Sequence, residues 1–523
     1  MYKVVIPSAG KGTRLKDLSK HINKALVSVN QKPSISYVVE KFPENIEIVV
    51  PLGYKGDDIK DFLEIVYPNR KFSFVDVDLF EGPGSGLGYS LLKCKEILQC
   101  PFIFIPNDSI LEEDIPEPNS NWMGYSSLHT SEEYRSISIV NENVDNILPK
   151  GSSGNIYPYI GLCAIKDYEL FWKHMDDGLD KGAIEIGESY GLKMLLSSSE
   201  IKAKKFTWHD TGNLVALENA KKMLPKNKID AHILDKPDEA IWFCQNKVIK
   251  FHVDKNFIAD RVQRSKNLGN FVPKIQKHAD HMYSYNIVKG SVLSRNPTPK
   301  IFKSFLNFMS EFWSNPVSKD FKIDNFYKGC SIFYKDKTYE RLELFLKRFE
   351  VIDRKMIVNG ELIPCYKDVL GLLDWSDISK GIPVRFHGDL HFENILCTEE
   401  KNNPFCLLDW RQNFAGDTDV GDIYYDLAKL NHGLIISHEI INNNYFDIDV
   451  HAGSVSFDFH RKNLLFECQE ILKEWVDDNK YDWSKVKKMT NLIFLNISPL
   501  HDHPYSLLLY YFGLSSLWND LNK

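Results

Sequence analysis

Two short segments of this chain carry residues that suit the handling of a nucleoside triphosphate. Residues 8–15 read Ser-Ala-Gly-Lys-Gly-Thr-Arg-Leu, and Gly10 and Gly12 would let backbone N–H groups approach phosphate oxygens closely. Arg14 and the later Lys24 add two cations that could neutralise the α-phosphate and a departing pyrophosphate. This combination indicates transfer of a nucleotidyl group.

The second segment, residues 387–394, reads His-Gly-Asp-Leu-His-Phe-Glu-Asn, and Leu-Asp-Trp follows at 408–410. This pattern indicates transfer of a phosphoryl group from a nucleoside triphosphate. The two chemistries form a natural pair, because a kinase produces the phosphorylated compound that a nucleotidyltransferase consumes.

The elements around the first segment alternate between strands and helices. A glycine turn directly after the first strand lies where a parallel α/β sheet binds its ligands, at the carboxyl ends of the strands. Apolar runs predict strands at 2–7, 46–51, 72–77 and 102–106, and helices at 34–42, 57–66 and 86–98.

Further motifs follow the glycine turn in order: the glycine-rich segment 82–88, Pro-Asn-Asp at 106–108, and Trp-His-Asp-Thr-Gly-Asn at 208–213. Together these motifs resemble the sugar-phosphate nucleotidyltransferases over roughly the first 220 residues. The resemblance implies nucleotide binding by Ala9, Gly10, Gly12, Thr13 and Gly86, catalysis by Arg14 and Lys24, Mg²⁺ binding by Asp108 and Asp210, and a hold on the acceptor phosphate by Lys150.

Two positions depart from the pattern of this family. Asn107 stands where a glycine is common, and Leu87 replaces the usual small polar residue after the base-binding glycine. The second change leaves the base open, so the donor of the first site is CTP, UTP or GTP.

In the second half, strands are expected at 240–244 and 248–253, and 283–293 is expected to form a further strand and a hinge. With residues 387–394 and 408–410, this half resembles the aminoglycoside and choline phosphotransferases, relatives of the protein kinases, from about 240 to 430. The resemblance implies that Asp389 is the catalytic base, Asn394 and Asp409 bind Mg²⁺, Lys250 pairs with ATP, and His387 and Asp426 are structural.

The expected fold is therefore α/β, with a Rossmann-like nucleotidyltransferase domain at 1–224 that has a mainly parallel sheet. A two-lobed, protein-kinase-like α+β domain is expected at 236–523, with its small lobe at about 236–293 and its large lobe at about 294–523.

Composition agrees with a globular enzyme. The 523 residues are 43% hydrophobic and 26% charged, and the net charge of −7 argues against nucleic acid as a partner. Nine cysteines without a C-x-x-C pair, no secretion signal and no long apolar run predict a cytoplasmic protein without membrane insertion. The sequence leaves a homo-oligomer open.

The predicted function is bifunctional: a kinase that phosphorylates a small metabolite with ATP, and a Mg²⁺-dependent transferase that converts the product to a nucleoside-diphosphate precursor of capsule or lipopolysaccharide. A sugar acceptor is favoured. Choline, ethanolamine or a polyol stay open as acceptors, and so do an antibiotic-modifying kinase and an enzyme with one site, whose other domain only binds or regulates.

Two groups of residues in the second half bear on the acceptor. Asp417, Asp419 and Asp422 could bind a cationic acceptor, but a solvated acidic loop is the favoured interpretation. The aromatic residues Trp410, Tyr424 and Tyr425 could stack on a sugar or a quaternary ammonium, but such residues more often belong to the core.

Overall fold

The structure is a computed structural model, and it describes residues 2–127, 132–225, 238–314, 317, 320–451 and 453–522, without the side chain of His438. The chain forms two compact units. One comprises Met1–Lys255 and Gln276–Ile287, and the other comprises Asn256–Ile275 and Val288–Lys523. The domain boundary expected between 224 and 236 falls mostly on 226–237, outside the described residues.

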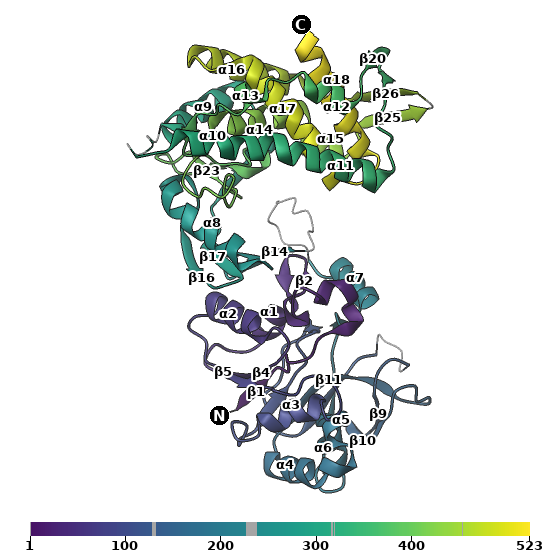
Figure 1. The fold of residues 1–523 in the computed structure, drawn as a ribbon. Helices are drawn as coiled ribbons and strands as arrows, with labels where there is room; N and C mark the ends of the chain where they lie inside the picture. Colours follow the sequence, from purple (N-terminus) through teal and green to yellow (C-terminus); the bar gives the residue numbers. More distant parts are fainter. Residues whose placement is uncertain are drawn as a thin grey trace. The chain divides into compact units, whose positions relative to one another are not determined.

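A nine-stranded mixed sheet forms the centre of the first unit (Figure 1). Its first four strands are mutually parallel and carry the glycine turn, whereas antiparallel pairs join β6 to β11, β11 to β8, β12 to β10 and β10 to β9. In spatial order the strands are β5 (Phe72–Asp76), β4 (Glu47–Leu52), β1 (Lys3–Val5), β6 (Phe102–Phe104), β11 (Tyr157–Ile165), β8 (Trp122–Tyr125), β12 (Lys202–Lys205), β10 (Asn143–Leu148) and β9 (Ser136–Val140).

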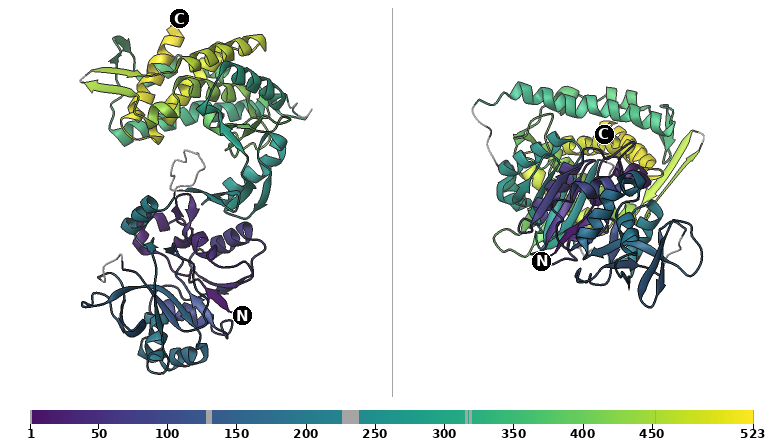
Figure 2. Two further views of the ribbon diagram at one scale, coloured as in Figure 1. Left: turned by 180° about the vertical axis from the view of Figure 1, so that it is seen from behind. Right: turned by 90° about the horizontal axis from the view of Figure 1, so that it is seen from below.

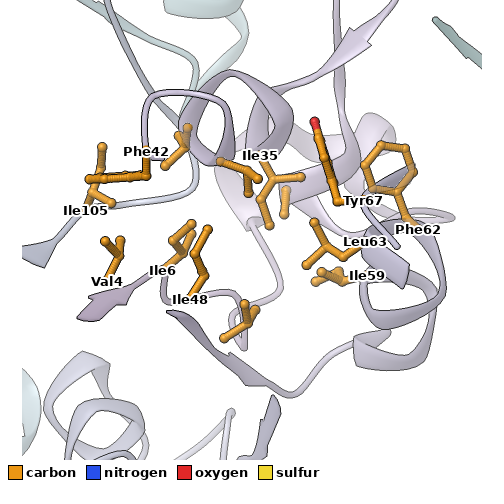
Figure 3. Close-up of a cluster of buried hydrophobic side chains, with 14 of the residues drawn as sticks. Val4, Ile6, Ile35, Phe42, Ile48, Ile59, Phe62, Leu63, Tyr67 and Ile105 are labelled. Carbon is orange, nitrogen blue, oxygen red and sulfur yellow. The ribbon is translucent and has the colours of Figure 1, made fainter. Parts of the chain in front are cut away.

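Apolar side chains of the parallel strands alternate between the two faces of the sheet, as strand geometry requires. Val4 and Ile48 belong to one buried cluster, and their neighbours Val5 and Val49 belong to another. Figure 3 shows the first cluster, where strand residues meet residues of the helices α1 and α2. The helices of this unit are α1 (Ser34–Val39), α2 (Gly56–Val66), α3 (Leu87–Lys93), α4 (Tyr168–Asp177), α5 (Ala183–Ile186), α6 (Glu188–Leu195) and α7 (Leu214–Met223).

The sheet that carries Lys250 also belongs largely to the first unit. Its strands are β14 (Glu239–Cys244), β15 (Lys247–His252), β17 (Met282–Asn286) and β16 (Ile275–His278). Trp242 of β14 is fully buried in the same cluster as Val4, with its ring 5.3 Å from that of Phe62 on α2. The Nζ atom of Lys247 donates a hydrogen bond to the Ile65 carbonyl at 2.7 Å. This small sheet is therefore part of the core of the first unit.

The second unit consists mainly of helices. Figure 2 shows a long yellow-green hairpin, β25 and β26, that extends from these helices. The helices are α8 (Lys255–Leu268), α9 (Pro299–Trp313), α10 (Ile323–Ser331), α11 (Lys337–Phe349), α12 (Tyr366–Gly371), α13 (Trp375–Ile378), α14 (Ile423–Ile435), α15 (His438–Asn442), α16 (Asn463–Asp478), α17 (Trp483–Ile497) and α18 (Tyr505–Asn522).

In the part of this unit that the structure describes, three small sheets accompany the helices, and no helix is long and apolar enough to cross a bilayer. The sheets are β18 (Gly290–Val292) with β22 (Ile395–Thr398) and β23 (Phe405–Leu407); β20 (Glu361–Ile363), β19 (Met356–Val358), β26 (Ser454–Phe459) and β25 (Phe446–His451); and β21 (Pro383–Val384) with β24 (Gly421–Asp422).

Candidate active sites

The glycine turn after β1 is shaped to let Lys24 pass close to the backbone. Gly12 has a left-handed φ of 68°, and a Cβ atom there would lie 2.7 Å from the Cβ of Lys24. A larger residue would therefore be strained in its backbone and would collide with Lys24. Thr13 follows as the exposed first residue of a short 3₁₀ helix, Thr13–Ser19.

A cavity of about 460 Å³ lies beside this turn. Gly12 and Thr13 lie between the wall residues Gly10 and Arg14 in the sequence, but they are not part of the cavity wall. Of the residues that the sequence predicts for the first site, the wall contains Ala9, Gly10, Arg14, Lys24, Gly86, Asp108, Lys150 and Asp210.

The pairing of two short strands brings Asp108 and Asp210 together. Strand β7 (Ser109–Leu111) pairs antiparallel with β13 (Trp208–Asp210), so that Asp210 lies opposite Ser109. A Cβ atom added to Gly212 would lie 3.0 Å from Asp108 Oδ2 and 3.1 Å from Asp210 Oδ1. Both carboxylates thus face the space beside Gly212.

The charges around these two carboxylates differ. Burial and the neighbouring Asp108 raise the pKa of Asp210, which accepts a hydrogen bond from the Tyr134 hydroxyl at 2.8 Å. Burial also acts to raise the pKa of Asp108, but Lys24, 3.1 Å away, and Arg14 lower it overall.

This arrangement fits Mg²⁺. Two converging carboxylates repel each other, and a hard divalent cation with oxygen ligands would remove that repulsion. Among the described residues no three or more His, Cys, Asp or Glu side chains are grouped to hold a metal. Asp108 and Asp210 would therefore share the ion with water and substrate phosphates, as Mg²⁺ commonly requires.

Three further residues of the cavity wall escape sequence reasoning: Tyr134, Arg135 and Glu188. Glu188 is 4% exposed, and burial raises its pKa to about 7. Its Oε2 atom has no hydrogen-bond partner among the residues described. The cavity thus contains a carboxyl group able to bind a ligand hydroxyl or amine. Glu188 is the first residue of α6, and no motif in the sequence marks it.

In the second unit, Asp426 on α14 holds the loop 387–394 in place. Its carboxylate accepts hydrogen bonds from the backbone N–H groups of His387 and Gly388, both at 2.7 Å, and from Trp313 Nε1 at 3.1 Å. His387 is fully buried, and burial lowers its pKa to about 3. Its neutral ring bonds through Nε2 to the Leu408 carbonyl at 2.8 Å. Both residues therefore have the geometry of structural supports.

Asp389 lies among partners that keep it ionised. Its Oδ1 atom is 2.9 Å from Lys429 Nζ on α14. Burial acts to raise the pKa of Asp389, but Lys429 and His391 lower it well below its usual range. The nearby Asn394 donates from Nδ2 to the Asp389 carbonyl at 2.9 Å.

Asn394 and Asp409 lie at one end of the β22–β23 hairpin. The Leu408 N–H donates to the Asn394 carbonyl at 2.8 Å, which extends the pairing of the two strands to this point. The amide oxygen of Asn394 has no donor among the described residues, so it is available to a cation. Asp409 has a left-handed φ of 57°, and its Oδ1 atom is 2.9 Å from Arg261. The pair offers oxygen ligands suited to Mg²⁺.

Two supports of this site were not apparent from the sequence. Lys429 directly follows the segment 421–428 that contains Asp426, but that segment assigns it no role, and Arg264 lies on α8, far from the loop in the chain. The buried Arg264 donates to the carbonyl groups of Phe386, Arg411 and Thr418. Only tertiary contacts reveal these two roles.

Lys250, predicted to pair with ATP, is buried in the middle of β15, where it lies opposite Ile241 and Tyr283. Its nucleotide-binding role stays a prediction.

Asp417, Asp419 and Asp422 were expected to form a solvated acidic loop, and one of them does not. Asp422 is fully buried rather than solvated, because it accepts hydrogen bonds from the Tyr334 hydroxyl at 2.8 Å and the Ile382 N–H at 2.9 Å. Asp417 closes a turn by accepting from the N–H groups of Asp419 and Val420. The three aromatic residues Trp410, Tyr424 and Tyr425 are all buried, as expected for core residues.

Comparisons with known proteins divide the chain in the same way. A model of the phosphotransferase enzyme family matches residues 359–438. The chain is 26% identical over 221 residues to the bifunctional protein GlmU of Methanococcus vannielii, which covers 40% of this chain and 51% of that protein. It is 40% identical over 70 residues to the choline-phosphate cytidylyltransferase of Streptococcus pneumoniae, which covers 13% of this chain and 30% of that protein.

Among solved structures, the CTP:phosphocholine cytidylyltransferase from Streptococcus pneumoniae is similar, with 20% identity and a TM-score of 0.36 over 43% of this chain and 99% of that chain. The chain spans about half the length of the GlmU proteins that it matches. The N-terminal half thus matches sugar-phosphate nucleotidyltransferases, and the C-terminal half contains a phosphotransferase-family domain.

Proposed function

We propose that the chain is a bifunctional enzyme. One site phosphorylates a hydroxyl group of a small metabolite with ATP, and the other joins the product to a nucleoside monophosphate and releases pyrophosphate. The observation that carries this proposal is that each unit gathers its own phosphate-handling set. Asp108 and Asp210 converge on one cavity, and Asp389, Asn394 and Asp409 gather at the end of one hairpin.

In the first site, the phosphate of the acceptor attacks the α-phosphorus of the nucleotide in line, and pyrophosphate leaves. Such a reaction needs alignment and neutralised charge more than covalent help. Arg14 and Lys24 face the charge that develops on the phosphates, and Lys150 holds the acceptor phosphate. Mg²⁺ held by Asp108 and Asp210 would supply further neutralisation.

In the second site, Asp389 accepts a hydrogen bond from the acceptor hydroxyl and orients its oxygen toward the γ-phosphorus of ATP. Its low pKa suits orientation rather than early removal of the proton. Asn394 and Asp409 would hold Mg²⁺ beside the ATP phosphates.

The favoured acceptor is a sugar, and the product is an activated precursor for capsule or lipopolysaccharide. Similarity to a choline-phosphate cytidylyltransferase and to a UTP–glucose-1-phosphate uridylyltransferase supports a pyrimidine donor, CTP or UTP. The first of these relatives also supports a second candidate function, a choline, ethanolamine or polyol kinase joined to a cytidylyltransferase.

Reciprocal variants of the full chain test the proposal. We expect Asp389→Asn to abolish ADP formation but to leave pyrophosphate release from CTP or UTP with a supplied phosphorylated acceptor unchanged. We expect Asp108→Ala to do the reverse. Mass spectrometry of products across a panel of acceptors and nucleoside triphosphates provides both measurements.

Two exposed carboxylates serve as matched controls, Asp114→Ala in the first unit and Asp447→Asn in the second. Neither control should alter either activity. If Asp389→Asn also stopped transfer onto a supplied phosphorylated acceptor, the two sites would not be independent. If wild-type protein performed only one reaction with every donor and acceptor, the other unit would be a binding or regulatory module.

A further inference from the structure

Lys337 lies close enough to three other cationic side chains and to the carboxylate of Asp389 for their charges to act on it. Lys337 and Arg341 come from α11, Arg411 follows the Asp409 turn, and Lys429 comes from α14. Lys429 forms the 2.9 Å ion pair with Asp389. These four residues are called the cationic cluster below.

Packing fixes two members of the cationic cluster on one aromatic ring, that of Phe333. Lys337 Nζ lies 4.4 Å from the centre of the Phe333 ring, and the guanidinium carbon of Arg411 lies 4.8 Å from the same centre. A Cβ atom at Gly388 would lie only 2.6 Å from the Cβ of Arg411. Arg411 therefore packs directly against the residue that precedes Asp389.

The cationic cluster is electrostatically unfavourable without a ligand. Burial, together with the charges of Arg411, Arg341 and Lys429, lowers the pKa of Lys337 to about 7, while Asp389 opposes the shift. Lys337 and Arg341 are four residues apart, so they project from one face of α11, where like charges destabilise a helix. No carboxylate forms an ion pair with Lys337 among the described residues.

The helix that presents Lys337 is also irregular. A π-helical turn, Ile332–Asp336, connects α10 to α11 directly before Lys337. Such turns are rare and occur frequently at functional sites, because they shift the register of the side chains that follow. This irregularity is independent of the charges, and it affects the same residues.

The surroundings of Asp389 offer little to a cationic acceptor. The neighbouring Glu393 is engaged with His391, whose Nδ1 atom lies 2.9 Å from Glu393 Oε2. Asp417 Oδ1 accepts hydrogen bonds from two backbone N–H groups, and both oxygens of Asp422 accept from the Tyr334 hydroxyl and from backbone N–H groups. The aromatic residues that could surround an ammonium group are buried in the core.

We propose that the acceptor of the kinase site is an anionic hydroxyl compound, whose carboxylate or phosphate group binds Lys337 and Arg341 while its hydroxyl faces Asp389. This inference rests on the proposed kinase activity. The acceptor oxygen forms a bond to the γ-phosphorus, the bond from that phosphorus to the β,γ-bridging oxygen breaks, and ADP leaves. The hydroxyl proton passes to the Asp389 carboxylate and then to solvent.

Matched pairs of acceptors test the proposal with the full chain. Glycerate is compared with glycerol, galacturonate with galactose, and glucose 6-phosphate with glucose, and choline and ethanolamine complete the panel. ADP formation should favour the anionic member of at least one pair by about tenfold or more, the value of one charge-assisted hydrogen bond. The first two pairs report a carboxylate and the third a phosphate.

Variants then separate binding of the acceptor from binding of ATP. Lys337→Gln and Arg341→Gln should each raise KM for the preferred anion about tenfold and leave KM for ATP unchanged. Lys347→Gln, on the exposed side of α11, is the matched control and should change neither constant. Lys337→Arg, which keeps the charge, should restore part of the affinity.

Three outcomes would overturn the proposal. The first is that no anionic acceptor is used more efficiently than its neutral partner, or that choline or ethanolamine is used as efficiently as every anionic acceptor. The second is a rise in KM for ATP instead of the acceptor in Lys337→Gln, which would assign the cationic cluster to the γ-phosphate. The third is no ADP formation above that of Asp389→Asn with any acceptor, which would reject the kinase activity itself and this inference with it.

Discussion

The two candidate sites distribute charge in opposite ways. In the first unit Asp108 and Asp210 converge on one space, and burial together with the charge of Asp108 raises the pKa of Asp210. In the second unit each carboxylate has its own cation, Lys429 for Asp389 and Arg261 for Asp409, both at 2.9 Å. Among the described residues of the first site, Lys24 pairs with Asp108 and no cation forms an ion pair with Asp210, whereas in the second site the cationic cluster outnumbers the carboxylate of Asp389.

The largest effect is expected when the chain is truncated directly after the nine-stranded sheet domain, before the small sheet. A chain that ends at Pro225 loses the small sheet, and with it Trp242, Ile249 and Phe251 leave the core of the first unit. Burial of one such side chain contributes about 1.5–3 kcal/mol, so three together approach the whole stability of a domain. We expect this chain to aggregate or to unfold without cooperativity by calorimetry.

A chain that ends at Ile287 retains the small sheet and is the control for this truncation. It should unfold cooperatively and retain the transferase activity. Equal melting temperatures for the two truncated chains would show that the small sheet contributes nothing to the first unit.

The next largest effect is expected at Asp426. Asp426→Ala leaves three buried donors, on His387, Gly388 and Trp313, without their acceptor, at about 1–3 kcal/mol each. The catalytic loop should lose its shape, and ADP formation should fall about a hundredfold or more while transferase activity stays unchanged. Asp477→Ala, an exposed change on α16, is the control. Normal kinase activity in Asp426→Ala would refute this supporting role.

Gly212→Ala tests the convergence of carboxylates in the first site. The added methyl group would lie 3.0 Å from Asp108 Oδ2 and 3.1 Å from Asp210 Oδ1, closer than most such contacts. We expect kcat/KM of the transferase to fall about tenfold or more, because small displacements of reacting groups lower the rate strongly. The melting temperature and ADP formation should change little. Gly371→Ala is the control, because an added Cβ atom there meets no other atom within 4 Å, and it should change none of these quantities. An unchanged transferase would place the metal elsewhere.

The sequence contains enough information to predict the parts of each site that follow a local rule. Gly10, Arg14 and Lys24 follow the first strand, and they line the cavity because parallel strands gather their carboxyl ends at one edge. Asp389 and Asn394 share one short loop, so their spacing in the chain already brings them together.

The remaining features depend on contacts between distant segments. Asp108 meets Asp210 only because β7 pairs with β13, about a hundred residues later in the chain. The cationic cluster combines α11 with α14, and neither helix carries a motif that reveals it. The burial of Asp422 against Tyr334 likewise has no local signal, which is why a solvated loop was the wrong interpretation there.

The smallest expected effect, a shift of stability with pH, tests the surplus charge of the second site. Burial and neighbouring cations hold the pKa of Lys337 at about 7 in the folded chain, below its ordinary value of 10.5. Between these two values the unfolded chain binds more protons than the folded chain, so the stability of the wild type rises with pH. Lys337→Met removes the charge and should therefore melt a few degrees higher than wild type at pH 7.

This advantage of Lys337→Met should shrink as the pH approaches 10, because removing the proton from the lysine on folding costs less as the pH nears its ordinary pKa of 10.5. Melting temperatures at pH 7, 8.5 and 10 measure the effect, and Lys347→Met, from the exposed side of α11, should follow the wild type at every pH. Parallel curves for Lys337→Met and wild type would show that the cationic cluster is not strained. If Lys337→Met gains stability at pH 7 but loses affinity for an anionic acceptor, the repulsion within the cationic cluster lowers stability and the same charges bind the acceptor.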